Sequence, residues 1–223
     1  MEDFIFKKVD FKDSATMEQI YRLRFEVYCW ECGFLKEEDY PDRRDSDEYD
    51  VQSVHFAALD SEGAVIATLR MILPGALPLP IQTHCHDIHL PPNDSLYGEI
   101  SRLVISRRLR RRKDDHLYYG PQVTDEVVIT DHAEYLRRAR PMAFGLYREM
   151  YRESKARGIT HWFSLMEKGL WLLLAIHGFK FSCIGEEVDV YGPVKPYRGN
   201  VSEIEVEVRK KFPKFFSYFM QTS

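Results

Sequence analysis

The sequence predicts an α/β (α+β) fold in which a mixed, mostly antiparallel sheet is flanked by helices. Two observations predict it: segments of helical period alternate with short strand-like runs, and two of those runs are separated by a short polar turn. The length of 223 residues, with 44% hydrophobic and 30% charged residues, suits one compact globular domain. We therefore expect a single domain over residues 1–223.

The first half of the chain is expected to hold one helix and three strands, over residues 14–28, 54–59, 64–73 and 96–105. In the helix, Met17, Ile20 and Tyr21 share one stripe, Ser14 is the expected N-cap and Gly33 follows the end. The glycine-containing turn between the first two strands predicts an antiparallel hairpin. Prolines exclude regular structure from most of the stretch before the third strand, where we expect only one short turn.

The second half is expected to alternate helices and strands, with strands at 159–166, 179–183, 188–191 and 201–208 and helices at 131–138, 141–157, 168–176 and 211–220. Pro141 suits the first position of its helix, and Gly158 suits the end of that helix. The apolar helix at 168–176 is expected to be buried. The large side chains expected to fill the core are Trp162, Phe163, Trp171 and Phe179.

Composition excludes several classes of protein. The net charge of −4 argues against a dedicated nucleic-acid binder. No apolar run approaches the roughly 20 residues of a membrane span, and the acidic N-terminus lacks the features of a secretory signal, so we expect a cytoplasmic protein. Four cysteines are too few for a disulfide scaffold. The sequence has no phosphate-binding loop, dinucleotide fingerprint, serine-hydrolase elbow or zinc-protease motif.

Two motifs could be mistaken for metal or redox sites. Cys29 and Cys32 have CxxC spacing, but they lie at the C-terminal end of the first helix, where the helix dipole disfavours a thiolate. Residues 84–89 contain several potential ligands, yet no second cluster completes a tetrahedral set. We therefore expect no metal site, and interpret the two motifs as half-buried thiols and a loop.

Charge is distributed unevenly along the chain. Residues 36–50 hold eight acidic and three basic side chains, whereas residues 102–113 hold seven basic and no acidic ones. The basic segment is either a solvated face or a surface for a polyanion. In the strand before it, Glu99, Ser101 and Arg102 interrupt an apolar pattern, which is unusual for a central strand.

Four short motifs follow one another along the chain: Tyr21-Arg-Leu-Arg24, Asp47-Glu-Tyr-Asp50, Leu69-Arg70 and Glu99-Ile-Ser-Arg102. Over about residues 15–110, this ordered set resembles the acyl-homoserine-lactone (autoinducer) synthases and the related N-acyl amino acid synthases. Together with the phrases Phe25-Glu-Val-Tyr-Cys29, Gly33-Phe34 and Glu38-Asp-Tyr-Pro41, it is similar to the acyltransferases associated with PEP-CTERM/exosortase systems.

The resemblance implies a GNAT-like acyltransferase fold, whose sheet is splayed between two central strands where a thioester arm enters. More loosely, the helix from Pro141, the strand from Ile159 and residues 170–179 are similar to the segments that line the family's acyl tunnel. Two departures leave the acceptor open. Autoinducer synthases usually carry Trp where this chain has Phe34, and residues 113–140 look like an insertion.

Acyl transfer from a thioester to an amine needs a proton acceptor, a donor that polarises the carbonyl, and alignment of both substrates. We expect Glu99 to be the base, acting directly or through one water, because apolar neighbours favour the protonated form of a carboxyl group. The alternative is an ion pair between Glu99 and Arg102. We expect Ser101 to orient a water or protonate the departing thiolate, and amides at a strand bulge to bind the oxyanion.

The resemblance assigns the acceptor site to a set of charged and aromatic residues: Arg24, Tyr28, Phe34, Asp47, Asp50, Arg70 and Arg102. In the family, such opposite charges shape the acceptor pocket and order the N-terminal lid. The alternative is a salt-bridge network with a purely structural role, which would cost about 3–5 kcal/mol to break on one side if it is buried.

The basic segment follows the strand where GNAT enzymes grip the phosphates of the donor. The segment contains no glycine, and the next glycine along the chain is Gly120. It therefore lacks the usual glycine-containing loop that holds the pyrophosphate of CoA. Guanidinium groups suit the phosphate and acidic helix of an acyl-carrier protein better, although acyl-CoA stays possible as donor. The expected donor-binding residues are Arg107, Arg108, Arg110, Arg111 and Arg112.

These expectations combine into an N-acyltransferase without a tightly bound cofactor, which moves a fatty acyl chain from acyl-carrier protein to the α-amine of an amino acid or similar small amine. One alternative is an autoinducer synthase that uses S-adenosylmethionine as acceptor. Another is a regulator that binds the acyl chain or the carrier protein without turnover, and a nucleic-acid binder is a more distant one.

Overall fold

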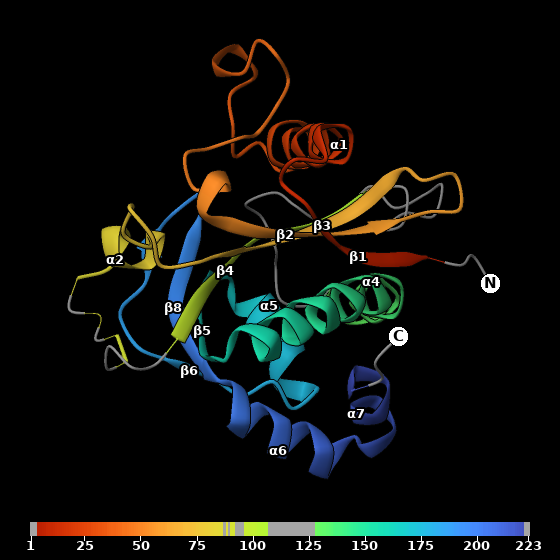
Figure 1. Cartoon of the computed structure of the whole chain (residues 1–223), viewed down its shortest axis with the longest axis vertical. Coiled ribbons are helices and arrows are strands. Elements are labelled where there is room, and N and C mark those ends of the chain that lie inside the picture. The colour runs from red at the N-terminus through yellow and green to blue at the C-terminus, as the bar shows by residue number, and fades with distance from the viewer. Residues whose placement is uncertain (1–3, 87, 89, 92–95, 107–127, 221–223) are drawn as a thin grey trace. The chain divides into compact units, whose positions relative to one another are not determined.

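A computed structural model describes residues 4–86, 88, 90–91, 96–106 and 128–220 (Figure 1). The chain divides into two compact units, and the strands β3 (Val65–Ile72) and β4 (Leu96–Ile105) contribute to both. The expected basic donor segment lies outside the described residues, as does most of the expected insertion at 113–140.

The first unit comprises Met1–Glu48, Val54–Arg70 and Arg102–Glu149. Its elements are β1 (Ile5–Val9), α1 (Ser14–Phe25), a π-helical turn η1 (Glu26–Glu31), the 3-10 turn η2 (Glu37–Asp39), most of β2 (Ser53–Leu59), and parts of β3, β4 and α4 (Val128–Arg157). β1 pairs antiparallel with β2. Met17, Ile20 and Tyr21 of α1 pack with Val9 and Ala57 into a buried cluster, as the predicted stripe requires.

The second unit comprises Tyr49–Ser53, Met71–Ser101 and Met150–Ser223. Besides parts of β3, β4 and α4, its elements are η3 (Asp50–Gln52), α2 (Pro80–His84), β5 (Ile159–Met166), α5 (Lys168–Ile176), β6 (Phe181–Cys183), β7 (Val188–Asp189), β8 (Pro193–Asn200), α6 (Val201–Lys211) and α7 (Pro213–Met220). Helices α6 and α7 lie side by side near the C-terminus of the chain (Figure 1).

Strand pairing gives the mixed, mostly antiparallel sheet that the sequence predicts. The order of hydrogen-bonded strands is β1-β2-β3-β4-β5-β8-β6, with β7 beside β8. The pairing of β4 with β5 is parallel, whereas the pairings of β8 with β5, β6 and β7 are antiparallel.

Several predicted elements are confirmed closely. The hairpin strands are β2 and β3, the strand at 96–105 is β4, and the predicted ranges of β5 and α5 match residue for residue. Gly158 and Gly178 have φ angles of +71° and +86°. These left-handed conformations end helices with little strain only at glycine.

Other predictions are wrong. The N-cap of α1 is Asp13, whose side chain accepts from the Thr16 amide, and not Ser14. The expected strand at 201–208 is helix α6, which Asn200 caps and which buries Val201, Ile204 and Val208 at helical spacing.

Two expectations about helices also fail. The helices expected at 131–138 and 141–157 are parts of one helix, α4, which runs from Val128 to Arg157, so Pro141 is not at the first position of a helix. Proline inside a helix has a local cost of about 3 kcal/mol. Helix α5 is buried on one side only: Leu173 and Leu174 are buried, whereas Leu172 and Ile176 are 45% and 54% exposed and Trp171 is only partly buried. Trp162, Phe163 and Phe179 are buried as expected.

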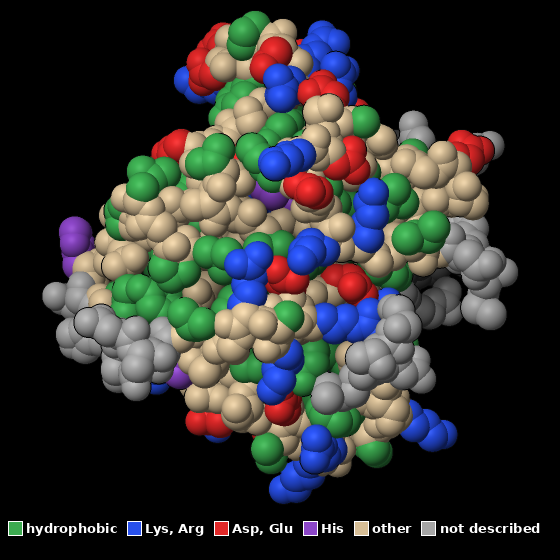
Figure 2. All heavy atoms as spheres, in the orientation of Figure 1, with side chains coloured by type: hydrophobic (Ala, Val, Ile, Leu, Met, Phe, Trp, Pro, Cys, Tyr) green, Lys and Arg blue, Asp and Glu red, His purple; other side chains and the backbone are tan. Residues whose placement is uncertain are grey.

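No described helix combines the length and apolar character needed to cross a membrane. On the face drawn in Figure 2, basic and acidic side chains are interspersed, so the described residues of that face form no broad basic patch.

Candidate active site

The two central strands of the second unit part at Glu99. Parallel pairing of β4 with β5 runs from Leu96 opposite Ile159 to Glu99 opposite Phe163, whereas β4 continues to Ile105 and β5 to Met166. Just beyond the last pair, the Ser164 hydroxyl donates to the Ile100 carbonyl at 3.0 Å. A side-chain bond thus satisfies a carbonyl at the point where the strands separate. The expected splay between two central strands is present.

The carboxylate of Glu99 is buried at this point. Glu99 is 2% exposed, and its Oε2 accepts the backbone N–H of Ile81, in α2, at 2.9 Å. Ile81 belongs to an apolar cluster with Leu79, Cys85 and Phe163. Burial raises the pKa of the Cys85 thiol, and the negative charge of Glu99 raises it further. The carboxyl group of Glu99 is therefore buried and accepts a backbone amide of α2.

Beyond Glu99, the backbone of β4 departs from regular strand geometry. Ser101 is half-buried, and the next residue, Arg102, has a φ of +52°. A left-handed non-glycine residue inside a strand interrupts the alternation of side chains and of hydrogen bonds. The sequence analysis expected amides at a strand bulge to bind the oxyanion, and an irregular strand of this kind can direct backbone N–H groups away from the neighbouring strand.

In the first unit, Arg102 is the centre of an ion-pair network. Its Nε donates to Asp45 Oδ2 at 2.8 Å, and its Nη2 reaches Asp45 Oδ1 at 3.3 Å and Asp47 Oδ2 at 3.2 Å. The other oxygen of Asp47 accepts Arg70 Nη1 at 2.5 Å. Arg70 and Asp45 are almost fully buried. The network therefore fixes two arginines with two carboxylates of the acidic segment.

Two aromatic residues of the predicted acceptor site lie against this network. The guanidinium of Arg102 lies 5.3 Å from the ring centroid of Tyr28, and the ring of Phe34 is 6.1 Å from that of Tyr28. Burial raises the pKa of Tyr28 to about 12, with the positive charge of Arg102 opposing the rise. Tyr28 lies in η1, where π-helical geometry changes the direction of the side chains relative to a continued α-helix.

Arg24 is fully buried, with its Nη2 3.2 Å from the Nδ1 of His55. The ring of Phe11 stacks on His55. Asp50 is 2% exposed and begins η3 in the second unit.

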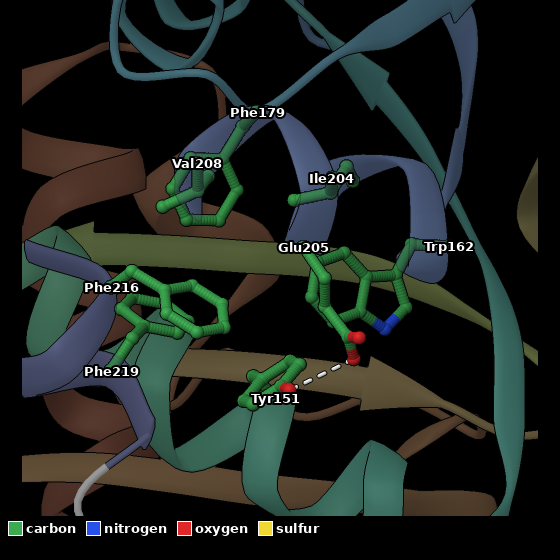
Figure 3. A pocket seen from close by; sticks show the side chains of 8 residues that line it. All are labelled: Tyr151, Trp162, Phe179, Ile204, Glu205, Val208, Phe216 and Phe219. Carbon is green, nitrogen blue, oxygen red and sulfur yellow. Dashed lines mark hydrogen bonds between the residues drawn. The ribbon is translucent and has the colours of Figure 1, made fainter. Parts of the chain in front are cut away.

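The second unit also contains a small apolar hollow between α4, β5, α6 and α7 (Figure 3). Its volume is about 10 Å³, about one water-sized sphere. At its wall, the Tyr151 hydroxyl donates to Glu205 Oε1 at 2.8 Å. The residues that line the hollow are Tyr151, Trp162, Phe179, Ile204, Glu205, Val208, Phe216 and Phe219. Phe179 and the strand residue Trp162 come from the segments expected to line an acyl tunnel.

The structure brings several of the predicted acceptor-site residues together and adds two neighbours that were not predicted. Arg70, Arg102, Asp47, Tyr28 and Phe34 are brought together within the first unit, whereas Asp45 and His55 were not predicted. Asp45 is one of eight acidic residues in its segment, and nothing in the sequence separates it from the exposed ones. The arginines from Arg107 to Arg112 lie outside the described residues. Among those described, no cluster of ligands could hold a metal ion.

Comparison with known proteins supports the fold. Residues 23–119, a little under half of the chain, match the family model of the acetyltransferase (GNAT) domain. No curated protein matches the sequence. The fold is GNAT-like, with the sheet and flanking helices of acyl-homoserine lactone (AHL) synthase structures.

Three solved structures illustrate the similarity. The AHL synthase LasI superposes with a TM-score of 0.67 at 14% identity, over 94% of this chain and 96% of LasI. The CoA-dependent synthase BjaI, solved with SAM and isopentyl-CoA, gives 0.68 at 17% identity, over 99% and 92%. FeeM, an N-acyl amino acid synthase from uncultured soil microbes, gives 0.59 at 13% identity, over 95% and 98%. At these identities the likeness establishes the fold alone.

Proposed function

We propose that this protein is an N-acyltransferase that moves a fatty acyl chain from the thioester of an acyl-carrier protein to the α-amine of an amino acid or similar small amine. The observation that carries the proposal is the position of Glu99, a desolvated carboxylate on the last paired residue of β4 before that strand parts from β5. Parted strands leave backbone groups for an extended thioester arm to bind. A carboxylate beside that arm can accept the proton of an attacking amine.

The reaction divides among residues of β4. The amine nitrogen attacks the thioester carbonyl carbon, and its proton passes to Glu99 directly or through one water. The C–S bond then breaks, and the thiolate takes a proton from Ser101 or from a water that Ser101 orients. The proton that Glu99 accepted from the amine returns to that donor, so Glu99 ends the cycle as a carboxylate. Amides near Arg102, where the backbone is left-handed, are the proposed donors to the oxyanion. The bonds from Arg102 to Asp45 and Asp47 hold this conformation.

The acceptor is assigned to the ion-pair network of the first unit. Arg102, Arg70 and Asp47 offer charged groups, and Tyr28 and Phe34 offer aromatic faces, which together suit a small zwitterion with a side chain. Arg24, which is buried against His55, stays a candidate acceptor-binding residue from the sequence motif. Asp50 stays a candidate acceptor-binding residue from the sequence motif.

The donor is assigned to two regions of different chemistry. The apolar hollow beside α7 is the proposed end of the acyl-chain site, and its small volume means that a chain must displace the phenylalanines that line it. The arginines from Arg107 to Arg112 are the proposed contact for the carrier protein. Acyl-CoA is the alternative donor, and the similar fold of BjaI, a CoA-dependent synthase, is a reason to test it.

One experiment tests the proposal. Purified protein is incubated with acyl-carrier protein or acyl-CoA and a panel of free amino acids, with thiol release followed and products identified by mass spectrometry. An N-acyl amino acid is the expected product. Absence of thiol release with every donor and acceptor would contradict the proposal. Tight binding of acyl-carrier protein without turnover would instead point to a regulator.

A second candidate, synthesis of an acyl-homoserine lactone, is favoured by the folds of LasI and BjaI. It uses the same carboxylate, donor and amine chemistry, and differs in taking S-adenosylmethionine as acceptor. Including that acceptor in the panel separates the candidates, because a lactone and a free N-acyl amino acid differ in mass.

A further inference from the structure

The segment that covers Glu99 is fastened by one side chain outside the predicted site. Gln52, the last residue of η3, makes three hydrogen bonds with its amide: Nε2 donates to the carbonyls of Leu73 and Leu77, and Oε1 accepts the Leu77 N–H, all at 3.1 Å. The Gln52 carbonyl also accepts the Leu73 N–H at 3.0 Å. One residue thus ties both ends of the loop at 73–77.

The fit between Gln52 and this loop is tight. A Cβ placed on Gly75 would lie 2.9 Å from Gln52 Oε1 and 3.1 Å from its Cδ. Contacts this short force one of the two groups to move. Glycine at position 75 therefore lets the loop close around the amide of Gln52.

The fastened loop leads directly into α2, whose Ile81 amide holds Glu99. Only a short stretch separates Leu77 from Ile81, and the N–H of Leu79 in this stretch donates to Oε1 of Gln82, the residue after Ile81, at 3.0 Å. Leu79 and Ile81 are both buried beside Phe163 of β5. The position of the Ile81 amide, 2.9 Å from Glu99 Oε2, is therefore set from one side by apolar packing and from the other by Gln52.

We infer that Gln52 is a positioning residue for Glu99: by fastening the loop at 73–77, it places the Ile81 amide against the carboxylate and so sets the pH at which Glu99 can act as a base. The inference rests on the proposed function. An N–H that donates to a carboxylate stabilises the charged form, so a misplaced amide makes Glu99 take up a proton at higher pH.

The test compares two variants with a matched control. Gln52→Met keeps the length of the side chain and removes its three hydrogen bonds. Gly75→Ala leaves Gln52 in place and displaces its amide, which keeps the test informative if the first variant folds poorly. Ser53→Ala is the control, since it removes the 2.6 Å bond from the neighbouring Ser53 hydroxyl to the Tyr49 carbonyl without touching the loop.

For Gln52→Met and Gly75→Ala, we expect kcat at neutral pH to fall about 10- to 100-fold, the range set by one hydrogen bond to a charged group. The acid limb of the pH–rate profile moves to higher pH, and KM for the acyl donor stays within about twofold of the wild-type value. A second readout needs no activity: mass mapping after thiol alkylation shows faster labelling of the buried Cys85. Ser53→Ala leaves all three quantities unchanged.

The outcomes separate the two proposals. If the wild-type protein transfers acyl groups and Glu99→Gln does not, but both Gln52→Met and Gly75→Ala keep the wild-type pH profile and Cys85 labelling rate, then the role of Gln52 is overturned and the proposed function stands. If the wild-type protein transfers no acyl group, or Glu99→Gln transfers as fast, the proposed function fails and the role of Gln52 fails with it.

Discussion

The guanidinium of Arg102 grips the carboxylate of Asp45 through two hydrogen bonds, one from Nε at 2.8 Å and one from Nη2 at 3.3 Å. Asp45 is 2% exposed, whereas Arg102 has the left-handed backbone that costs a non-glycine residue roughly 1–3 kcal/mol. A two-pronged, buried ion pair offsets that strain and holds the irregular part of β4 in one conformation.

Replacing Asp45 with Asn removes the charge of a buried carboxylate to which the partly buried guanidinium of Arg102 donates two hydrogen bonds. We expect Asp45→Asn to lower the free energy of unfolding by about 3–5 kcal/mol, measured by urea denaturation. The control is Asp42→Asn, because the Asp42 side chain is 58% exposed and lies 3.8 Å from Arg44. That change should cost less than about 1 kcal/mol. If both variants lowered the free energy of unfolding equally, the ion pair of Asp45 with Arg102 would stabilise the protein no more than an exposed pair does.

The phenol of Tyr28 gives a prediction about alkaline pH. Burial raises the pKa of Tyr28 to about 12 from its ordinary 10.0. Because the pKa of Tyr28 is higher in the folded than in the unfolded protein, ionisation of the phenol opposes folding. The unfolding free energy therefore keeps its full value with respect to this group below about pH 10 and falls as the pH rises towards 12.

Tyr28→Phe removes this titration. The unfolding free energy of the variant should therefore fall less steeply than that of the wild-type protein between about pH 9 and 11.5, as measured by urea denaturation at each pH. Burial also raises the pKa values of Tyr147, Tyr151 and Tyr197, but these groups titrate alike in both proteins. Identical slopes would show that Tyr28 is accessible to water.

Many helices and strands could be predicted from local sequence patterns, and the predictions that were wrong have physical causes. The strand at 159–166 and the helix at 168–176 were predicted because β-branched and aromatic residues give way to a leucine-rich stretch that ends at Gly178. Strand β8 was missed because it contains Pro193, Pro196 and Gly199, which locally disfavour a strand. Its pairing with β5 and β6 outweighs that local preference.

Members of the candidate site could be predicted only where the residue type is unusual for its place in the sequence. Glu99 and Arg102 stand out as charges within an apolar strand. In contrast, the choice of Asp45 as the partner of Arg102 depends on how the acidic segment folds back, with the Asp45 N–H donating to the Tyr21 carbonyl at 3.1 Å. The bond from Ile81 to Glu99 is likewise a tertiary contact with no local signal.

The basic segment predicts how the donor is recognised. Reversing the charge of Arg108, Arg111 and Arg112 should raise KM for acyl-carrier protein at least about tenfold, since opposite charges steer and hold the acidic carrier. KM for a short pantetheine thioester should change little. Steady-state kinetics with both donors decides, and equal changes would show that the segment does not recognise the carrier.

The apolar hollow predicts a residue that limits chain length. Phe216 of α7 lines the hollow, so Phe216→Ala should shift the preferred donor towards longer acyl chains, measured as the ratio of kcat/KM for a series of thioesters. Tyr218→Ala on the same helix is the control, because Tyr218 is 37% exposed and does not line the hollow. An unchanged ratio in Phe216→Ala would place the end of the acyl chain elsewhere.

The most direct measurement is thiol release by Glu99→Gln, compared with the wild-type protein and with Glu62→Gln in an exposed turn. The amide keeps the shape of the carboxylate but cannot accept the proton of the amine. We expect kcat to fall about 100-fold or more while circular dichroism and thermal unfolding show a folded protein, and Glu62→Gln to match the wild-type rate. A folded Glu99→Gln protein with wild-type turnover would contradict the account.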